Sequence, residues 1–165
     1  MEAQRLQRLL NEMSPELIKA LHLVAKHGAE IQGDWWIIGS TAALLAGVDS
    51  FNPDDVDLFG KSEVMTAFLR PFGHEPVSTP NPHQLKSNPY QRITVPNATP
   101  IEVMGGLEVF SEGHWRNLVV KTRLKVNGFG APLWVPSMLE QVTIFEMFGR
   151  PKDLAKAAIL RSSNI

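Results

Sequence analysis

The sequence predicts an α+β protein in which helices flank a mixed β-sheet. Its 165 residues, 44% of them hydrophobic and 20% charged, suit one globular domain with a real core. Strand-like and helix-like segments follow one another without the strict strand–helix–strand alternation of a doubly wound fold. We therefore expect a single domain over residues 1–165, with an N-terminal helix at 14–28, a core at 34–135 and closing helices within 137–161.

The first of these helices has recognisable start and stop signals. Ser14-Pro15-Glu16 combines a hydroxyl cap, a proline at the first helical position and an acid in the first turn. Apolar residues then recur at helical spacing as far as Gly28, which is a suitable stop after two basic residues. This pattern predicts a helix over residues 14–28.

The remaining elements follow from apolar periodicity and from turn-forming residues. We expect strands at 35–38, 56–59, 90–95, 99–104, 118–126 and 133–135. We expect helices at 41–46, 62–69, 137–148 and 152–160. The strands at 90–95 and 99–104 should pair through the turn Pro96-Asn97-Ala98. Residues 74–89 are expected to form a long loop with a short strand near Val77, and residues 105–117 a second loop.

Composition narrows the range of functions. There is no cysteine, which excludes disulfides, thiolate zinc sites and cysteine nucleophiles. The net charge of −1 gives no electrostatic argument for binding nucleic acid or a membrane. The apolar runs are too short to span a bilayer and the N-terminal residues have no signal-peptide core, so we expect a cytoplasmic protein without membrane contact.

The charges are unevenly distributed along the chain. Residues 1–60 hold nine acids and four lysines or arginines, whereas residues 113–165 hold three acids and eight lysines or arginines. This asymmetry is compatible with a basic wall that faces an acidic site. A surface gradient without a role is the alternative.

Three carboxylates are candidates for a metal site. Asp55 and Asp57 are one residue apart on a predicted strand, so they share a face about 6–7 Å apart. Two anions so placed repel each other unless a cation lies between them. Glu102 lies between two apolar residues on another predicted strand, and would join them if the two strands are neighbours. Three carboxylates suit Mg²⁺ (or Mn²⁺), although an Asp-x-Asp pair is also common as a cap or on a surface.

Gly39 and Ser40 follow a predicted strand and precede a short helix. Backbone N–H groups and a hydroxyl at such a junction can bind phosphate, although most Gly-Ser pairs are simple turns. In combination with the carboxylates, they indicate a site for a metal-bound nucleoside triphosphate.

The order and spacing of these residues resemble a known pattern. Ile38-Gly39-Ser40, a gap of fourteen residues, Asp55-Val56-Asp57-Leu58 and then Ile101-Glu102-Val103 are similar to the core motif of the DNA polymerase β-like nucleotidyltransferase superfamily. The C-terminal segment from Arg150 to Leu160, with Arg-Pro-Lys-Asp-Leu at its start, resembles the last helix of the minimal branch, which includes bacterial antibiotic and toxin-type nucleotidyltransferases.

This resemblance implies a nucleotidyltransferase-like fold and a role for each matching residue. Gly39 and Ser40 would hold the triphosphate of an NTP. Asp55 and Asp57 would bind the metal ions, and Glu102 would complete a second metal site or act as general base toward the acceptor hydroxyl. Arg150 and Lys152, with Asp153, would lie near the nucleotide or the acceptor. The implied activity is the transfer of an NMP group, in a toxin–antitoxin or resistance context.

The sequence departs from the family pattern at several positions. The third carboxylate is Glu102 where Asp is commoner, and Ser50-Phe51-Asn52-Pro53 replaces an Arg-x-Thr-like lead-in. Many toxin-type relatives have a lysine where this chain has Phe145. These departures keep a second hypothesis open: a nucleotide-binding module without turnover that acts as an antitoxin, sensor or scaffold. An unrelated structural domain is a third.

The acceptor is left open by the sequence. An antibiotic, an RNA end, a protein side chain and a small metabolite all remain candidates, with nucleic acid involved only as an acceptor. The chain is short for this superfamily, so the acceptor groove is expected to come from the loop at 74–89, from the loop at 105–117, or from a second subunit or partner protein.

Overall fold

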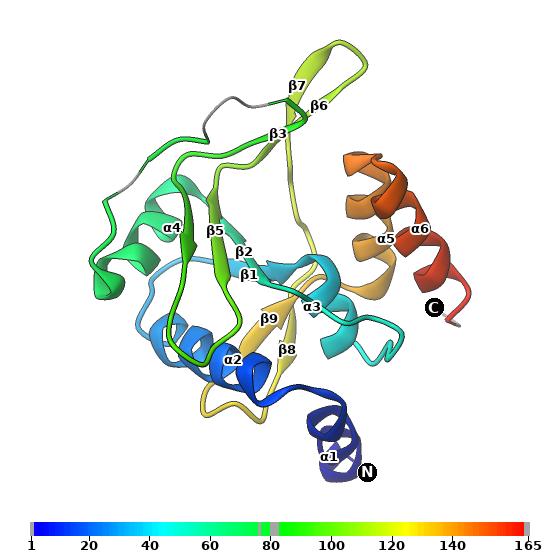
Figure 1. Ribbon diagram of the computed structural model, residues 1–165. Helices are drawn as coiled ribbons and strands as arrows, with labels where there is room; N and C mark the ends of the chain where they lie inside the picture. The colour runs from blue at the N-terminus through cyan, green and yellow to red at the C-terminus, as the bar shows by residue number, and fades with distance from the viewer. Residues whose placement is uncertain (1, 76, 80–82, 164–165) are drawn as a thin grey trace.

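A four-stranded mixed sheet lies at the centre of the computed structural model, which describes residues 2–75, 77–79 and 83–163 (Figure 1). The strand order is β1 (Trp35–Ile38), β2 (Val56–Gly60), β5 (Ile101–Gly105) and β4 (Tyr90–Ile93). β2 and β5 run parallel, whereas β1 and β4 are antiparallel to their neighbours. The predicted α+β class with a mixed sheet is confirmed.

Helices and smaller sheets surround this central sheet. The helices are α1 (Glu2–Glu12), α2 (Pro15–Gly28), α3 (Gly39–Leu45), α4 (Ser62–Leu69), the 3₁₀ turn η1 (Arg70–Phe72), α5 (Met138–Phe148) and α6 (Pro151–Arg161). A three-stranded sheet joins β3 (Leu85–Lys86), β6 (Glu108–Ser111) and β7 (His114–Asn117). β8 (Leu124–Val126) pairs with β9 (Leu133–Val135).

The two faces of the central sheet have different environments. Alternate residues of its strands point to opposite faces, so Ile37, Leu58 and Val103 join the larger core beneath α2 and α4. Ile38 and Met104 join a smaller core that includes residues of α5 and β6. By the same alternation, Asp57 and Glu102 lie on the face of the sheet that carries Ile38 and Met104. The candidate site therefore lies at the edge of the smaller core, on the α5 side of the sheet.

Helix α2 forms where its capping signals predict. The Ser14 hydroxyl accepts a hydrogen bond from the Leu17 N–H at 3.1 Å, and Pro15 occupies the first turn. The strands of the central sheet and the closing helices also lie where they were predicted, to within two residues.

Helix α1 is an element that the sequence reasoning did not assign. It is amphipathic, and its Leu9 is buried in the larger core. Met13, which directly follows the helix, is buried there too. The spacing of Leu6, Leu9, Leu10 and Met13 is the helical signal that would have predicted it.

The prediction of a loop at 105–117 is wrong, because most of this segment forms the hairpin of β6 and β7. Its two central residues, Glu112 and Gly113, have φ of 52° and 85°. Positive φ at both positions matches the right-handed twist of the flanking strands and allows a two-residue turn. The Glu-Gly pair between alternating segments was therefore the missed signal.

The strand predicted at 118–126 is confirmed only at its end, as β8. The backbone N–H groups of Lys121 and Thr122 donate to the Glu140 carboxylate on α5, each at 2.8 Å. Since these donors are satisfied by a side chain, this part of the segment joins no sheet. The short strand expected near Val77 is likewise displaced, to β3.

Within the part of the chain that the structure describes, no helix is both long and apolar enough to cross a membrane.

Candidate active site

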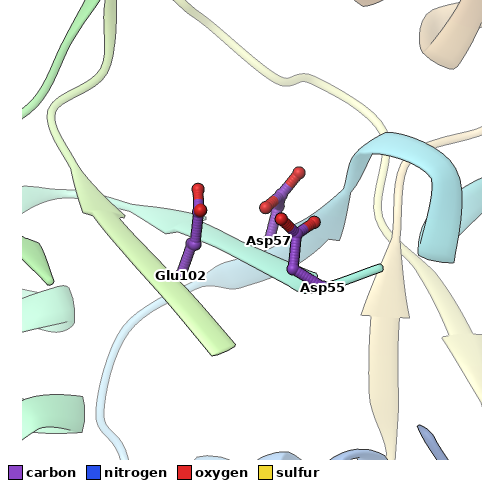
Figure 2. A group of neighbouring side chains, drawn as sticks. All are labelled: Asp55, Asp57 and Glu102. Carbon is purple, nitrogen blue, oxygen red and sulfur yellow. The ribbon is translucent and has the colours of Figure 1, made fainter. Parts of the chain in front are cut away.

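Three carboxylates meet at the parallel pair of strands. Asp57 of β2 and Glu102 of β5 are direct register partners, and Asp55 immediately precedes β2. One oxygen from each carboxylate lies within 4.8 Å of the other two. Figure 2 shows the three side chains projecting toward one region above the strands. The structure thus brings together the three residues that the sequence singled out, as a cluster that could hold a metal ion.

Helix α3 holds two of these residues in place. The buried Thr41 hydroxyl donates to the Asp55 carbonyl at 2.8 Å. Ile38 at the end of β1 pairs with Asp57, so the chain turns into α3 directly beside that carboxylate. Gly39 makes this turn with φ of 75°, and a Cβ there would lie 2.7 Å from Asp57 Oδ2. Gly39 is therefore required both by its conformation and by its contact with the carboxylate.

The carboxylates disfavour one another's ionisation. Burial, followed by the charges of Asp55 and Glu102, raises the pKa of Asp57 well above its ordinary value. Burial and the charge of Asp55 also raise the pKa of Glu102, against the opposing effect of neighbouring cations. Stacked like charges of this kind cost stability unless a cation compensates them, and they are typical of functional sites.

Arg92 of β4 is a cation already in contact with the cluster. It is the register partner of Glu102, and its Nη1 donates to Glu102 Oε1 at 2.6 Å. The same nitrogen lies 3.5 Å from Asp55 Oδ2. Burial lowers the pKa of the Arg92 guanidinium, but the hydrogen bond and charge of Glu102 outweigh it and raise that pKa overall.

A cavity of about 590 Å³ opens in front of the carboxylates. Ser40 and Gly39 line it beside the acidic cluster, and the segment 50–54 closes one side. Its floor includes apolar side chains of the smaller core, such as Met104 and Phe148. The opposite wall carries three basic residues: Arg150, which is the N-cap of the last helix, and Lys152 and Lys156 of the helix itself.

The three basic residues are not equivalent. The Arg150 guanidinium donates to both oxygens of the buried Asp153, at 2.5 and 3.1 Å, and the Arg150 backbone N–H donates to the same carboxylate at 3.3 Å, at the start of α6. Lys152 and Lys156 instead act across the cavity: the charge of Lys152 lowers the pKa of Glu102, and that of Lys156 lowers the pKa of Asp57. The basic wall that the charge asymmetry suggested is therefore present and faces the acidic cluster.

The structure shows the surroundings of Phe145, the position at which the resemblance in sequence led us to expect a lysine. Phe145 is 3% exposed and belongs to the larger core. The Lys156 ammonium lies 5.8 Å from the centre of its ring. A cation is thus supplied to this part of the cavity by α6 instead of α5.

Sequence reasoning missed Arg92 and Lys156, although a signal existed for each. A hairpin centred on Asn97 places Arg92 opposite Glu102, as observed. Lys156 is four residues after Lys152, so both lie on one face of the predicted last helix.

Comparison with known proteins identifies one class of fold for this chain. No protein-family model matches the chain, and no curated protein is similar to it in sequence. The structure is similar to that of a "putative nucleotidyltransferase" from Thermotoga maritima, with a TM-score of 0.72 and 21% identity over 91% of this chain and 93% of that one. The chain therefore has a nucleotidyltransferase-like fold, as its motifs predicted, with an acidic cluster that could bind a divalent metal.

Proposed function

We propose that this protein is a nucleotidyltransferase that transfers an NMP group from an NTP to an acceptor hydroxyl. The observation that carries the proposal is the register of β2 and β5, which aligns Asp57 with Glu102 directly beside the Gly39 turn. In the reaction, the acceptor oxygen forms a bond to the α-phosphorus, the bond from that phosphorus to the β-phosphate oxygen breaks, and pyrophosphate leaves. The acceptor proton passes to a base.

The residues of the cavity divide these tasks in our proposal. Asp55 and Asp57 would hold a divalent ion, Mg²⁺ or Mn²⁺, and such an ion would supply charge stabilisation to the triphosphate. Glu102 is placed to receive the acceptor proton. Gly39 and Ser40 offer backbone and hydroxyl donors to phosphate, from a turn that would be strained by any larger residue at position 39.

The basic wall binds the phosphates that leave. Lys152 and Lys156 face the carboxylates across the cavity, so a triphosphate between the walls meets the metal on one side and ammonium groups on the other. Arg150 borders the same cavity, but its guanidinium is bound to Asp153. We propose that Arg150 mainly stabilises the start of α6 and contacts the nucleotide only secondarily.

Glu102→Gln tests the assignment of the base. It preserves shape while removing the charge, so NTP affinity should stay within a few fold while transfer falls by about 10²–10⁴, the usual contribution of a positioned base. Transfer is measured as pyrophosphate release with each NTP and Mg²⁺ over a panel of acceptors, including the protein itself. Glu108→Gln, a change of the same type on β6, is the matched control and should have no effect. Equal rates for wild type and Glu102→Gln would remove Glu102 from this role.

A second candidate function is a nucleotide-binding module without turnover, acting as an antitoxin, sensor or scaffold. Two observations favour it: the buried Phe145 at the family's lysine position, and the Arg92–Glu102 contact that engages the proposed base. Metal-dependent NTP binding without pyrophosphate release in the presence of any acceptor would support this module over the enzyme. Phe145→Lys is a poor reversion, because it would bury an ammonium in the core.

The acceptor defines the biological context. An antibiotic, an RNA end or a protein side chain each presents a hydroxyl, and the last two would place the protein in a toxin–antitoxin pair. Among the residues that the structure describes, no separate domain for the acceptor borders the cavity. We propose that any further acceptor contacts come from a second subunit or a partner protein. Transfer assays with and without candidate partners distinguish these cases.

A further inference from the structure

Arg92 lies where a second metal ion would be expected. The family resemblance implies two metal ions among three carboxylates, yet the guanidinium already contacts the side of the cluster formed by Asp55 and Glu102. Among the described residues, no ion pair joins Arg92 to Asp57. The cluster is therefore divided into a side that contains a resident cation and a side that does not.

Charge balance leads to the same division. Three ionised carboxylates together with one guanidinium leave two negative charges, which a single divalent ion neutralises. A second divalent ion would lie against the guanidinium, and two cations a few ångströms apart repel strongly in a partly dry site. The hydrogen bond of 2.6 Å also occupies one of the two oxygens that Glu102 could offer to a second ion.

The backbone pairing of β4 and β5 fixes the position of Arg92 beside Glu102. Arg92 and Glu102 are opposite one another in the β4–β5 ladder, so their approach does not depend on a flexible loop. Neighbouring positions in antiparallel strands bring such side chains within contact distance. The pair is partly exposed, with side-chain exposures of 46% for Arg92 and 20% for Glu102, so its contribution to stability alone is small.

We propose that Arg92 is a built-in substitute for the second metal ion, so that this site binds one divalent ion, between Asp55 and Asp57. This inference rests on the proposed metal-dependent function and refines it. Arg92 would hold Glu102 away from the metal and keep the site at a net charge that one ion balances. Arg92 is thus a positioning residue that sets the number of metal ions.

The test counts the metal ions bound by the full chain. Purified protein is titrated with Mn²⁺ alone and the free ion is measured by electron paramagnetic resonance. Wild type should bind one Mn²⁺ per chain, Arg92→Gln two, and Arg92→Lys one, because lysine restores the charge. The first ion should also bind about tenfold more tightly to Arg92→Gln, since a neighbouring positive charge is lost. Arg116→Gln, which removes an arginine from the distant Glu112 pair, is the matched control and should resemble wild type.

Thermal unfolding in EDTA provides a second measurement. Arg92→Gln should unfold at a lower temperature than wild type without metal, and Mn²⁺ should raise its unfolding temperature more. Two ions in wild type, an unchanged count in Arg92→Gln, or no binding by either protein would overturn the inference. If the counts come out as expected but the protein neither binds nor transfers a nucleotide, the proposed function fails while the role of Arg92 stands.

Discussion

The two walls of the cavity place like charges together in different ways. On the acidic wall, Asp57 and Glu102 are adjacent in a rigid β-ladder. Their mutual repulsion is offset only in part, by Arg92 in direct contact and by Lys152 and Lys156 across the cavity. On the basic wall, Lys152 and Lys156 are separated by one helical turn, and Arg150 is paired with the buried Asp153. Repulsion is thus concentrated on one wall and relieved on the other.

This difference leads us to expect that the two walls depend differently on a bound ligand. Helix α6 would form and cap without any nucleotide, because its start is stabilised by its own arginine and aspartate. The strand carboxylates repel one another, and Arg92 contacts only Asp55 and Glu102 among them, so a further cation beside Asp57 would relieve the repulsion that remains. The acidic wall should therefore be the part of the molecule whose stability depends most on metal.

The largest expected effect breaks the acidic wall. Asp57→Asn removes one of the ligands of the proposed shared ion, so Mg²⁺-dependent NTP affinity should fall by about 100-fold (~2.7 kcal/mol), as measured by calorimetry. The same change should stabilise the metal-free protein, because it relieves the repulsion from Asp55 and Glu102. Asp49→Asn, at an exposed position away from the cavity, is the control for both measurements.

The pH dependence of this change has a definite sign. Because the pKa of Asp57 is raised above its ordinary 3.8 in the folded state, the folded protein holds that proton more tightly than the unfolded chain. Wild-type stability in EDTA should therefore fall relative to Asp57→Asn as the pH rises from about 3.8 through the folded pKa. Added Mg²⁺ should cancel the difference. A wild type that is the more stable protein in EDTA at neutral pH would indicate a structural carboxylate.

The next effect breaks the basic wall without touching its lysines. Asp153→Asn leaves the Arg150 guanidinium without its charged partner and weakens the hydrogen bond that the Arg150 backbone N–H donates to position 153, so the free energy of unfolding should fall by about 2 kcal/mol. Thermal unfolding should report this loss with or without metal. A loss that appears only without metal would mean that Asp153 belongs to the acidic site.

The smallest expected effect sharpens the contrast between the walls. Lys156→Gln removes one ammonium from the cavity, so NTP affinity should fall by about tenfold (~1.4 kcal/mol) and depend less on salt, with stability nearly unchanged. Lys125→Gln, on β8 outside the cavity, should alter neither quantity. Unchanged NTP affinity in Lys156→Gln would leave Lys152 as the phosphate contact of α6.

Much of the fold could be predicted because its signals are local. The Ser14 cap, the apolar strands and the Gly39 turn each depend on a few adjacent residues. One failure occurred where a distant group decided the outcome, and others where a local signal was overlooked. The segment at 118–123 is not a strand because Glu140, far along the chain, binds its backbone donors. The hairpin of β6 and β7 was missed because its turn residues, Glu112 and Gly113, were not recognised as such.

The sequence by itself determined which chemistry was available: three carboxylates in two motifs, a Gly-Ser turn and a basic last helix. Their alternation also determined that Asp55 and Asp57 share a face. Only the tertiary structure decided that β2 lies parallel to β5, because register between distant strands is selected by core packing and not by either strand alone. That choice sets Asp57 against Glu102. The position of the last helix likewise brings Lys156 toward Asp57, whereas Arg92 reaches Glu102 through the local β4–β5 hairpin.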